Sequence, residues 1–418
     1  MLNWGRRFSI FVLLDSHGFP DAFKGQGCLV GAGVVTKLEP AGGDLLIRLA
    51  QLHSSSGDYI FGHIGYDFKN ILEPGLESRH PARLGFPDYF FFVPETVCSV
   101  NPEGTELAIS SVYNPKDVIR EILDASDFEN AILPKVNFKT RVQRDEYLAQ
   151  VAAIREHIAA GDCYELNYCV EGYCDNASID ATAAYQALSK LSPAPFSAFY
   201  RLGSLSMACA SPERYVRKQG RRLVCQPIKG TAARGVDQEH DERLKSELFS
   251  SAKERAENVM IVDLMRNDLA RCCKPGTVTV EELFGIYTFP RVHQMISTVS
   301  GMLRDGLSLG EALRCTFPMG SMTGAPKYKV MQLIDRYEAS RRELFSGTLG
   351  YIAPNGDFDF NVVIRSLFYR SDNGYLSYQS GGAITYDSVP EAEWDELKLK
   401  SWAMERIFAG NDALNSTS

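Results

Sequence analysis

Short apolar runs broken by glycine, proline and aspartate fill the first 135 residues of the chain. The runs FSIFVLLD (8–15), GDYIFGHIGYDF (57–68) and DYFFFVPETVCSV (88–100) are rich in aromatic and β-branched residues, which predicts β-strands. We therefore expect residues 1–135 to form a β-rich N-terminal region that is integrated with the rest of the core.

The pattern becomes helical at 144–160, where apolar residues recur three or four positions apart and Gly161 follows as a C-cap. Helices are also predicted at 183–191, 241–271, 309–316, 325–337 and 390–409. Strands are predicted at 163–174, 196–201, 205–210, 222–228, 347–353, 361–369 and 374–380. Strands and helices thus come in blocks, which favours an α+β fold of large mixed or antiparallel sheets packed together with helices on the outside.

Composition narrows the class of protein. The 418 residues are 45% hydrophobic and 23% charged, which is typical of a soluble globular protein, and the net charge of −8 argues against a nucleic-acid partner. No run approaches the roughly 20 apolar residues of a membrane span. The ten cysteines include no C-x2-C pair, so we expect reduced thiols in a cytoplasmic protein. The polar end, 411–418, is expected to be a frayed tail.

Two predicted helices each carry a Glu-x-x-Glu pair at the edge of an apolar face. Glu254 and Glu257 share a stripe with Ile261, and Glu393 and Glu396 lie beside the apolar stripe of the last helix. A carboxylate buried in such a place is costly unless it is paired or binds a cation. The spacing leaves two alternatives open, namely solvated or salt-bridged glutamates and a shared Mg²⁺ held by oxygen ligands.

Several motifs then occur together in one order. They are SPERY (211–215), QPIKGT (226–231), AENVMIVDLMRNDLAR (256–271), VHQMIS (292–297), FPMGSMTGAPK (317–327), NVVIRS (361–366) and EAEWDE (391–396). This order resembles the chorismate-utilising enzymes, which include anthranilate synthase component I, aminodeoxychorismate synthase component I, and the isochorismate and salicylate synthases. The resemblance implies the fold of anthranilate synthase component I and a chorismate-binding catalytic region at 140–409. GHIGYD (62–67) resembles an N-terminal element of the amino-group-adding members.

The resemblance implies specific roles for the acidic residues. Glu257 and Glu396 match ligands of a Mg²⁺ that binds the ring carboxylate of chorismate, with Glu254 and Glu393 in support. Glu213 matches the general acid that protonates the departing C4 hydroxyl, and burial is expected to raise its pKa. Without the resemblance, Glu213 would be interpreted as a partner of a nearby arginine.

Further residues of the implied site bind the substrate. Arg365 matches a ligand of a substrate carboxylate, since its guanidinium can bind two oxygens at once. Backbone close to the ring is implied at Gly230, Thr231, Gly381, Gly382 and Ala383. Ala383 departs from the family, which has a glycine there. His293 matches a histidine of the ring pocket, with a hydrogen-bonded core histidine as the alternative.

Two positions indicate the branch of the family. Glu165 stands where the isochorismate and salicylate enzymes have a water-activating lysine, so this chain should not add water. Lys229 stands where anthranilate synthases have alanine and aminodeoxychorismate synthases have lysine. In the latter branch the lysine attacks C2 of chorismate as C4 loses its hydroxyl. Ammonia then adds at C4 and expels the lysine, which gives 4-amino-4-deoxychorismate.

A nucleophilic lysine must be neutral, so we expect the pKa of Lys229 to fall from about 10.4 towards about 7 through desolvation beside Ile228 and Gly230. The chain shows no glutaminase motif, so a separate glutamine amidotransferase subunit is expected to supply ammonia for this step towards 4-aminobenzoate and folate. Two alternatives are anthranilate synthase component I and a non-catalytic paralogue that binds chorismate or tryptophan. The intact Glu213, Lys229, Glu257 and Glu396 argue against the paralogue.

Overall fold

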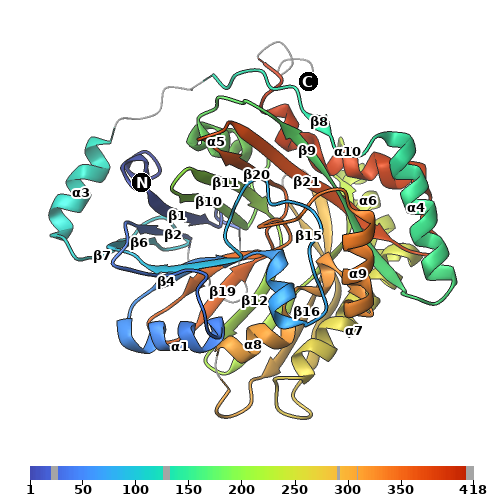
Figure 1. Ribbon diagram of the computed structural model, residues 1–418, viewed down its shortest axis with the longest axis horizontal. Helices are drawn as coiled ribbons and strands as arrows, with labels where there is room; N and C mark the ends of the chain where they lie inside the picture. Colours follow the sequence, from blue (N-terminus) through green and yellow to red (C-terminus); the bar gives the residue numbers. More distant parts are fainter. Residues whose placement is uncertain (20–26, 126–131, 290–291, 308, 411–418) are drawn as a thin grey trace.

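Two large antiparallel β-sheets carry the fold, and helices lie around them (Figure 1). The computed structural model describes residues 1–19, 27–125, 132–289, 292–307 and 309–410, so the tail predicted at 411–418 lies outside the described residues. The largest apolar cluster contains Val12 and Met207 from one sheet and Phe61 and Phe91 from the other. The inner faces of the two sheets therefore pack against each other, and the predicted α+β class is confirmed.

The first sheet has eleven strands. In spatial order they are β17 (Gly324–Ala325), β9 (Glu165–Cys174), β21 (Tyr375–Ile384), β20 (Ser366–Arg370), β11 (Leu205–Ser211), β10 (Phe196–Leu202), β1 (Ile10–Asp15), β2 (Cys28–Ala32), β6 (Thr96–Val100) and β7 (Leu107–Ser111), and β8 (Lys139–Thr140) pairs with β9. The register of β21 against β9 places Ala383 opposite Asn167. The two longest strands of this sheet therefore lie side by side at its β9 end.

The second sheet has ten strands. In order they are β14 (Ile228–Ala233), β16 (Val292–Met302), β13 (Arg222–Gln226), β12 (Arg214–Gln219), β19 (Phe358–Asn361), β18 (Thr348–Ile352), β4 (Ile60–Ile64), β5 (Tyr89–Val93) and β3 (Thr36–Leu38), with β15 (Thr279–Thr288) paired to β16. Every residue of β4 and β5 is buried, which explains their unbroken apolar sequences. Strands from the first 135 residues thus enter both sheets beside strands from later in the chain.

Ten α-helices and three 3₁₀ turns complete the described part of the chain. The helices are α1 (Leu45–Ser56), α2 (Lys69–Leu72), α3 (Pro115–Asp124), α4 (Arg144–Ala159), α5 (Ala181–Leu191), α6 (Gln238–Ser250), α7 (Ala252–Ala270), α8 (Leu309–Thr316), α9 (Lys327–Tyr337) and α10 (Pro390–Arg406). The turns are η1 (Trp4–Arg7), η2 (Tyr66–Phe68) and η3 (Gly320–Met322). Figure 1 shows α4 and α10 together at one side and α1 beside α8 at another. No helix of the described chain is both long and apolar enough to cross a membrane.

The structure divides elements that the sequence predicts as continuous. The predicted helix 241–271 is two helices, because the Ser251 hydroxyl accepts a hydrogen bond from the Glu254 N–H and starts α7 anew. The predicted strand 361–369 is divided between β19 and β20, which belong to different sheets. At this division Arg365 has a φ of 50°, and its carbonyl accepts a hydrogen bond from the Ala210 N–H.

Candidate active site

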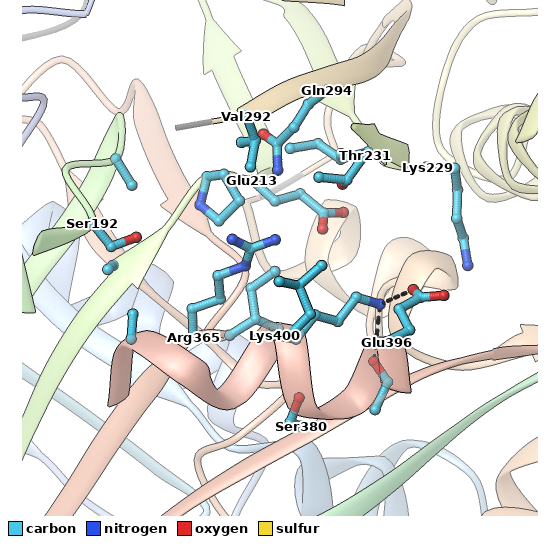
Figure 2. Close-up of a pocket in the computed structure, with 18 of the residues that line it drawn as sticks. Ser192, Glu213, Lys229, Thr231, Val292, Gln294, Arg365, Ser380, Glu396 and Lys400 are labelled. Carbon is cyan, nitrogen blue, oxygen red and sulfur yellow. Dashed lines mark hydrogen bonds and ion pairs between the residues drawn. The ribbon is translucent and has the colours of Figure 1, made fainter. Parts of the chain in front are cut away.

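A cavity of about 570 Å³ is lined by residues of β14 and β16 from the second sheet and of β9 and β21 from the first. Helices α7 and α10 also contribute side chains to its wall. Figure 2 shows that the carboxylate of Glu213, the guanidinium of Arg365 and the Glu396–Lys400 pair surround one space. The fold therefore gathers charged groups from distant parts of the chain around a single cavity.

Most of the residues predicted from the sequence lie in this wall. They are Glu213, Lys229, Gly230, Thr231, Glu254, Glu257, Arg365, Gly381, Ala383 and Glu396. The residues predicted but not found in the wall are His293, Gly382 and Glu393.

The structure places His293 outside the cavity, contrary to its predicted role. Strand alternation along β16 directs Val292 and Gln294 to the cavity and His293 to the other face. The buried ring has Nε2 2.9 Å from Oδ1 of Asp241 and Nδ1 3.0 Å from Oγ1 of Thr288. His293 is thus the hydrogen-bonded core histidine of the alternative interpretation, and Gln294 is the polar residue that this strand offers to a ligand.

Neither Gly382 nor Glu393 lines the cavity. Gly382 lies close to two glutamates of α10, Glu393 and Glu396. A Cβ atom added at Gly382 would be 3.3 Å from Oε2 of Glu393 and 3.7 Å from Oε1 of Glu396. Gly230 has the same relation to α7, since an added Cβ would be 3.0 Å from Oε2 of Glu254, and its φ of 92° favours glycine. Both glycines therefore let the backbone approach carboxylates closely.

Lys229 extends from β14 towards β9, where its amine lies 2.6 Å from Oε1 of Glu165. Both side chains are buried, with relative exposures of 9% and 2%. Since β14 and β9 belong to different sheets, the contact joins the two sheets beside the cavity. The second oxygen of Glu165, Oε2, is buried and has no hydrogen-bond partner among the described residues.

The structure contradicts the predicted fall in the pKa of Lys229. Burial opposes the charged amine, but the nearby carboxylates of Glu165 and Glu257 outweigh burial and raise the pKa of Lys229 above its ordinary value. The sequence shows only the adjacent Ile228 and Gly230, whereas folding brings acidic groups from β9 and α7. Lys229 is therefore an ammonium ion at rest, and its neutral form requires a proton acceptor.

Glu213 follows β11 and is 4% exposed. Burial raises the pKa of Glu213 to about 7, although the Ser321 hydroxyl and the charge of Lys229 partly oppose this rise. The carboxyl group is thus protonated in a large fraction of molecules near neutral pH. This confirms the predicted direction of the pKa shift and gives the cavity a group that can donate a proton.

Arg365 presents a guanidinium that has no hydrogen-bond or ion-pair partner among the described residues, although Glu396 is near enough to act on its charge. Burial lowers the pKa of Arg365 below its ordinary value. A non-glycine residue in the left-handed region costs about 1–2 kcal/mol, so its position is held by the surrounding sheet. A desolvated guanidinium with free donors is suited to a bidentate carboxylate ligand.

Four glutamates from α7 and α10 come together beside two lysines. Lys253 lies 3.9 Å from Glu257 and 3.6 Å from Glu393, and Lys400 lies 2.7 Å from Glu396. Burial raises the pKa of Glu257 to about 7 and also raises the pKa of Glu393. Lys400 overcomes the effect of burial and lowers the pKa of Glu396. The carboxylates are therefore only partly compensated by protein cations.

These glutamates fit an oxygen-coordinated divalent cation without forming a complete cage. Oε1 of Glu257 is buried and has no hydrogen-bond partner among the described residues, so it has a lone pair free for a ligand. Within the described chain no three His, Cys, Asp or Glu side chains converge closely enough to hold an ion by themselves. Mg²⁺ usually retains several waters and binds through one or two carboxylates, which suits this arrangement.

Sequence reasoning missed several polar groups of the cavity. They are Asn167, Lys253, Gln294, Ser321, Gln379 and Lys400. Lys400 had a signal, since it lies four residues after Glu396 and therefore on the same helical face. The contact between Glu165 and Lys229 had none, because it joins residues 64 positions apart.

Comparisons with known proteins identify the family of the chain. Residues 36–406 match the family model described as chorismate binding enzyme. The chain is 36% identical to the chloroplastic aminodeoxychorismate synthase of Arabidopsis thaliana over 83% of its own length and 40% of that protein. It is 32% identical to aminodeoxychorismate synthase component 1 of Bacillus subtilis, over 83% of its own length and 76% of that protein. The chain thus spans well under half of the plant relative.

A solved structure agrees with the fold. Anthranilate synthase component I from Streptococcus pneumoniae superposes with a TM-score of 0.81 at 25% identity, covering 93% of this chain and 94% of that one. The similar proteins therefore include both amino-group-adding branches, and overall similarity does not choose between them.

Proposed function

The chain belongs to the chorismate binding enzyme family, and from this premise we propose that it aminates chorismate at C4 to give 4-amino-4-deoxychorismate. The observation that carries the proposal is the buried Lys229 amine beside the cavity. A surface lysine would be solvated, whereas this one is held by Glu165 within reach of the cavity that contains Glu213 and Arg365. The names of the similar synthases support the same reaction.

The proposed first step joins Lys229 to the ring. Its neutral amine attacks C2, the C1=C2 and C5=C6 electron pairs shift to C1=C6 and C4=C5, and the C4–O bond breaks. Glu213 supplies the proton with which the hydroxyl leaves as water, and its raised pKa suits this role. The product of this step is an adduct in which the lysine nitrogen carries one positive charge.

The second step reverses the electron shift. Ammonia attacks C4, the two double bonds return to C1=C2 and C5=C6, and the C2–N bond breaks to release Lys229 as a neutral amine. Two displacements at allylic positions therefore leave nitrogen at C4 and regenerate the nucleophile. An enzyme with alanine in place of Lys229 has no such intermediate, so the lysine determines the position of amination.

Chorismate carries two carboxylates, and we assign each a binding group. Arg365 binds one carboxylate through its unpaired guanidinium. Glu257 and Glu396, with Glu254 and Glu393 behind them, would hold a Mg²⁺ near the other carboxylate. When bound, the ion would neutralise negative charge that the glutamates otherwise present to the substrate. The backbone at Thr231 and Ala383 would contact the ring.

Ammonia requires a source, and we propose that a separate glutamine amidotransferase subunit supplies it. Both sheets of the described chain contribute strands to the wall of the cavity. Ammonium salts should replace the partner in a purified assay, because ammonia is the only component that the partner would contribute to the chemistry.

The test combines purified chain, chorismate, Mg²⁺ and ammonium chloride, followed by identification of the product by mass and absorbance. We expect 4-amino-4-deoxychorismate without release of pyruvate, and we expect Lys229→Ala to abolish it. Formation of anthranilate and pyruvate would overturn the proposal in favour of ortho amination. Full activity of Lys229→Ala with unchanged product would overturn the covalent step.

A further inference from the structure

The carboxylate of Glu165 is fixed where the amine of Lys229 needs a proton acceptor. Its strand, β9, is paired on both sides, with Ala325 of β17 opposite Glu165 and Ile384 of β21 opposite the next residue, Leu166. The side chain is buried, and its Oε1 accepts the only hydrogen bond that the structure gives the Lys229 amine among the described residues. The strand pairing of β9 thus fixes the position of the Glu165 backbone.

A purely structural ion pair would use all of its hydrogen-bonding capacity. Glu165 does not, because its Oε2 is buried without a partner in the described chain. An unpartnered buried oxygen is a lasting cost to the folded state. Glu165 therefore holds Lys229 through one oxygen and keeps the other oxygen free.

Two other carboxylates face Lys229. Glu257 comes from α7 and Glu213 follows β11, and both act on the charge of the amine. Lys253 in turn faces Glu257 at 3.9 Å. Glu213 must retain its proton for the C4 hydroxyl, and no hydrogen bond joins Glu257 to Lys229 in the described chain. Glu165 is the group at hydrogen-bonding distance, at 2.6 Å.

We propose that Glu165 is the positioning residue for the nucleophile: it orients the Lys229 amine, takes up its proton before attack, and returns the proton when the amine is released. This inference rests on the proposed function. The proton stays within the pair throughout, passing from nitrogen to carboxylate before the C2–N bond forms and back after that bond breaks. The lysine lone pair makes the bond and returns to nitrogen on expulsion, so no external oxidant or base is needed.

The first experiment compares kcat and KM of the whole chain with those of Glu165→Gln across pH 6–9. Glutamine keeps the shape and the oxygen that accepts from Lys229, but it cannot take up a proton. We expect kcat to fall about 10²-fold at pH 7 with little change in KM, because one positioned proton acceptor contributes about that much. Lys229 must then lose its proton to solvent, so kcat of the variant should rise with pH. Glu165→Asp, which keeps the carboxylate, should recover part of the loss.

The second experiment measures the reactivity of the Lys229 amine in the absence of substrate. A small acylating reagent, acetic anhydride, is applied at several pH values, and acetylation of Lys229 is quantified by mass spectrometry of its peptide. Removal of the Glu165 charge should lower the pKa of Lys229, so Glu165→Gln should be acetylated faster than the wild type at pH 8 even though it turns over more slowly. A residue with only a structural role would not produce these opposite changes.

The outcomes separate the inference from the proposed function. If the wild type forms 4-amino-4-deoxychorismate and Glu165→Gln matches its kcat and pH profile, the inference is wrong and the function stands. A kcat loss that is equal at every pH, with unchanged acetylation, also overturns the inference, because it indicates altered packing. If the wild type forms a different product, the proposed function fails first.

Discussion

Strand β9 contacts two buried ion pairs, Glu338–Arg342 and Glu165–Lys229, and the difference between them is informative. Arg342 donates to both oxygens of Glu338, at 2.9 and 2.6 Å, and to the carbonyls of Met322 and Asn167 at 2.7 and 2.9 Å. The ring of Tyr66 lies 4.5 Å from its guanidinium carbon. Glu338 additionally accepts from the backbone N–H of Cys169. Most hydrogen-bond donors and acceptors of the Arg342–Glu338 pair therefore have partners.

The pair of Glu165 and Lys229 is almost as deeply buried, but within the described part of the chain it has a single hydrogen bond and an unpartnered oxygen. Lys229 of this pair lines the cavity. Arg342 does not line it, and meets cavity residues only through the carbonyls of Asn167 and Met322 and the ring of Phe345, 6.0 Å away, among the described residues. Burial alone therefore does not distinguish a structural ion pair from a reactive one. The number of satisfied donors and acceptors, together with adjacent space for a ligand, does distinguish them.

The largest expected effect comes from breaking the saturated pair. Arg342→Met should lower the free energy of unfolding by about 3–5 kcal/mol, because Glu338 is left buried and unpaired. Urea denaturation measures the change. Arg342→Met combined with Glu338→Gln should recover part of it, since glutamine is neutral and can still accept from Cys169. Lys229→Met should cost less stability while abolishing amination, and an equal loss in both variants would contradict the comparison.

The next largest effect concerns the acid of the cavity. Glu213→Gln should reduce kcat about 10²–10³-fold, or about 3–4 kcal/mol, because the hydroxyl then leaves without a proton. The donor form exists below a pKa of about 7, so its contribution in the wild type is lost as pH rises through 7. The variant should lack this dependence. Steady-state kinetics between pH 5.5 and 9 would refute the assignment if both proteins showed the same alkaline loss.

A smaller effect is expected on stability at Glu257. Its folded pKa of about 7 lies above the ordinary 4.5, so ionisation between these pH values destabilises the folded state of the wild type. Glu257→Gln should therefore be more stable than the wild type by about 1–3 kcal/mol at pH 8 and equal to it at pH 4.5. Thermal unfolding in EDTA provides the measurement. Adding Mg²⁺ should stabilise the wild type more than the variant.

The smallest effect is expected for an ion pair on the protein surface, which serves as a control for the two buried pairs. Asp263 and Arg266 form an exposed pair on α7 at 2.9 Å, with relative exposures of 74% and 53%. Asp263→Asn should change stability by less than about 0.5 kcal/mol, because water replaces the interaction. Urea denaturation of Asp263→Asn, measured together with that of Arg342→Met, provides the contrast. A loss of several kcal/mol here would show that burial is not the reason for the difference.

The sequence predicted much of the site because its signals are local. SPERY and QPIKGT locate Glu213 and Lys229, and helical spacing places Glu257 on an inward face and Glu396 beside the apolar stripe of its helix. The GHIGYD element has a structural explanation in the fold. The Tyr66 ring packs on Arg342, and Oδ2 of Asp67 accepts from the Glu343 N–H at 2.9 Å.

Predictions failed where the answer depended on segments distant in the sequence. His293 and Gln294 differ by one position, and only the pairing of β16 decides which of them faces the cavity. One failure was local, since the predicted helix 241–271 is divided where Ser251 caps the start of α7. The pKa of Lys229 had the wrong sign because apolar neighbours in sequence were outweighed by carboxylates from other elements.

The sequence by itself determined the class of fold, the family, and the residue types that the chemistry needs, since these depend on periodicity and on motifs of a few residues. The tertiary structure alone decided which charges meet. It placed Glu165 of one sheet 2.6 Å from Lys229 of the other and left one carboxylate oxygen without a partner among the residues that the structure describes. Electrostatic energies depend on the distance between charges and on their burial, and both are set by the tertiary structure.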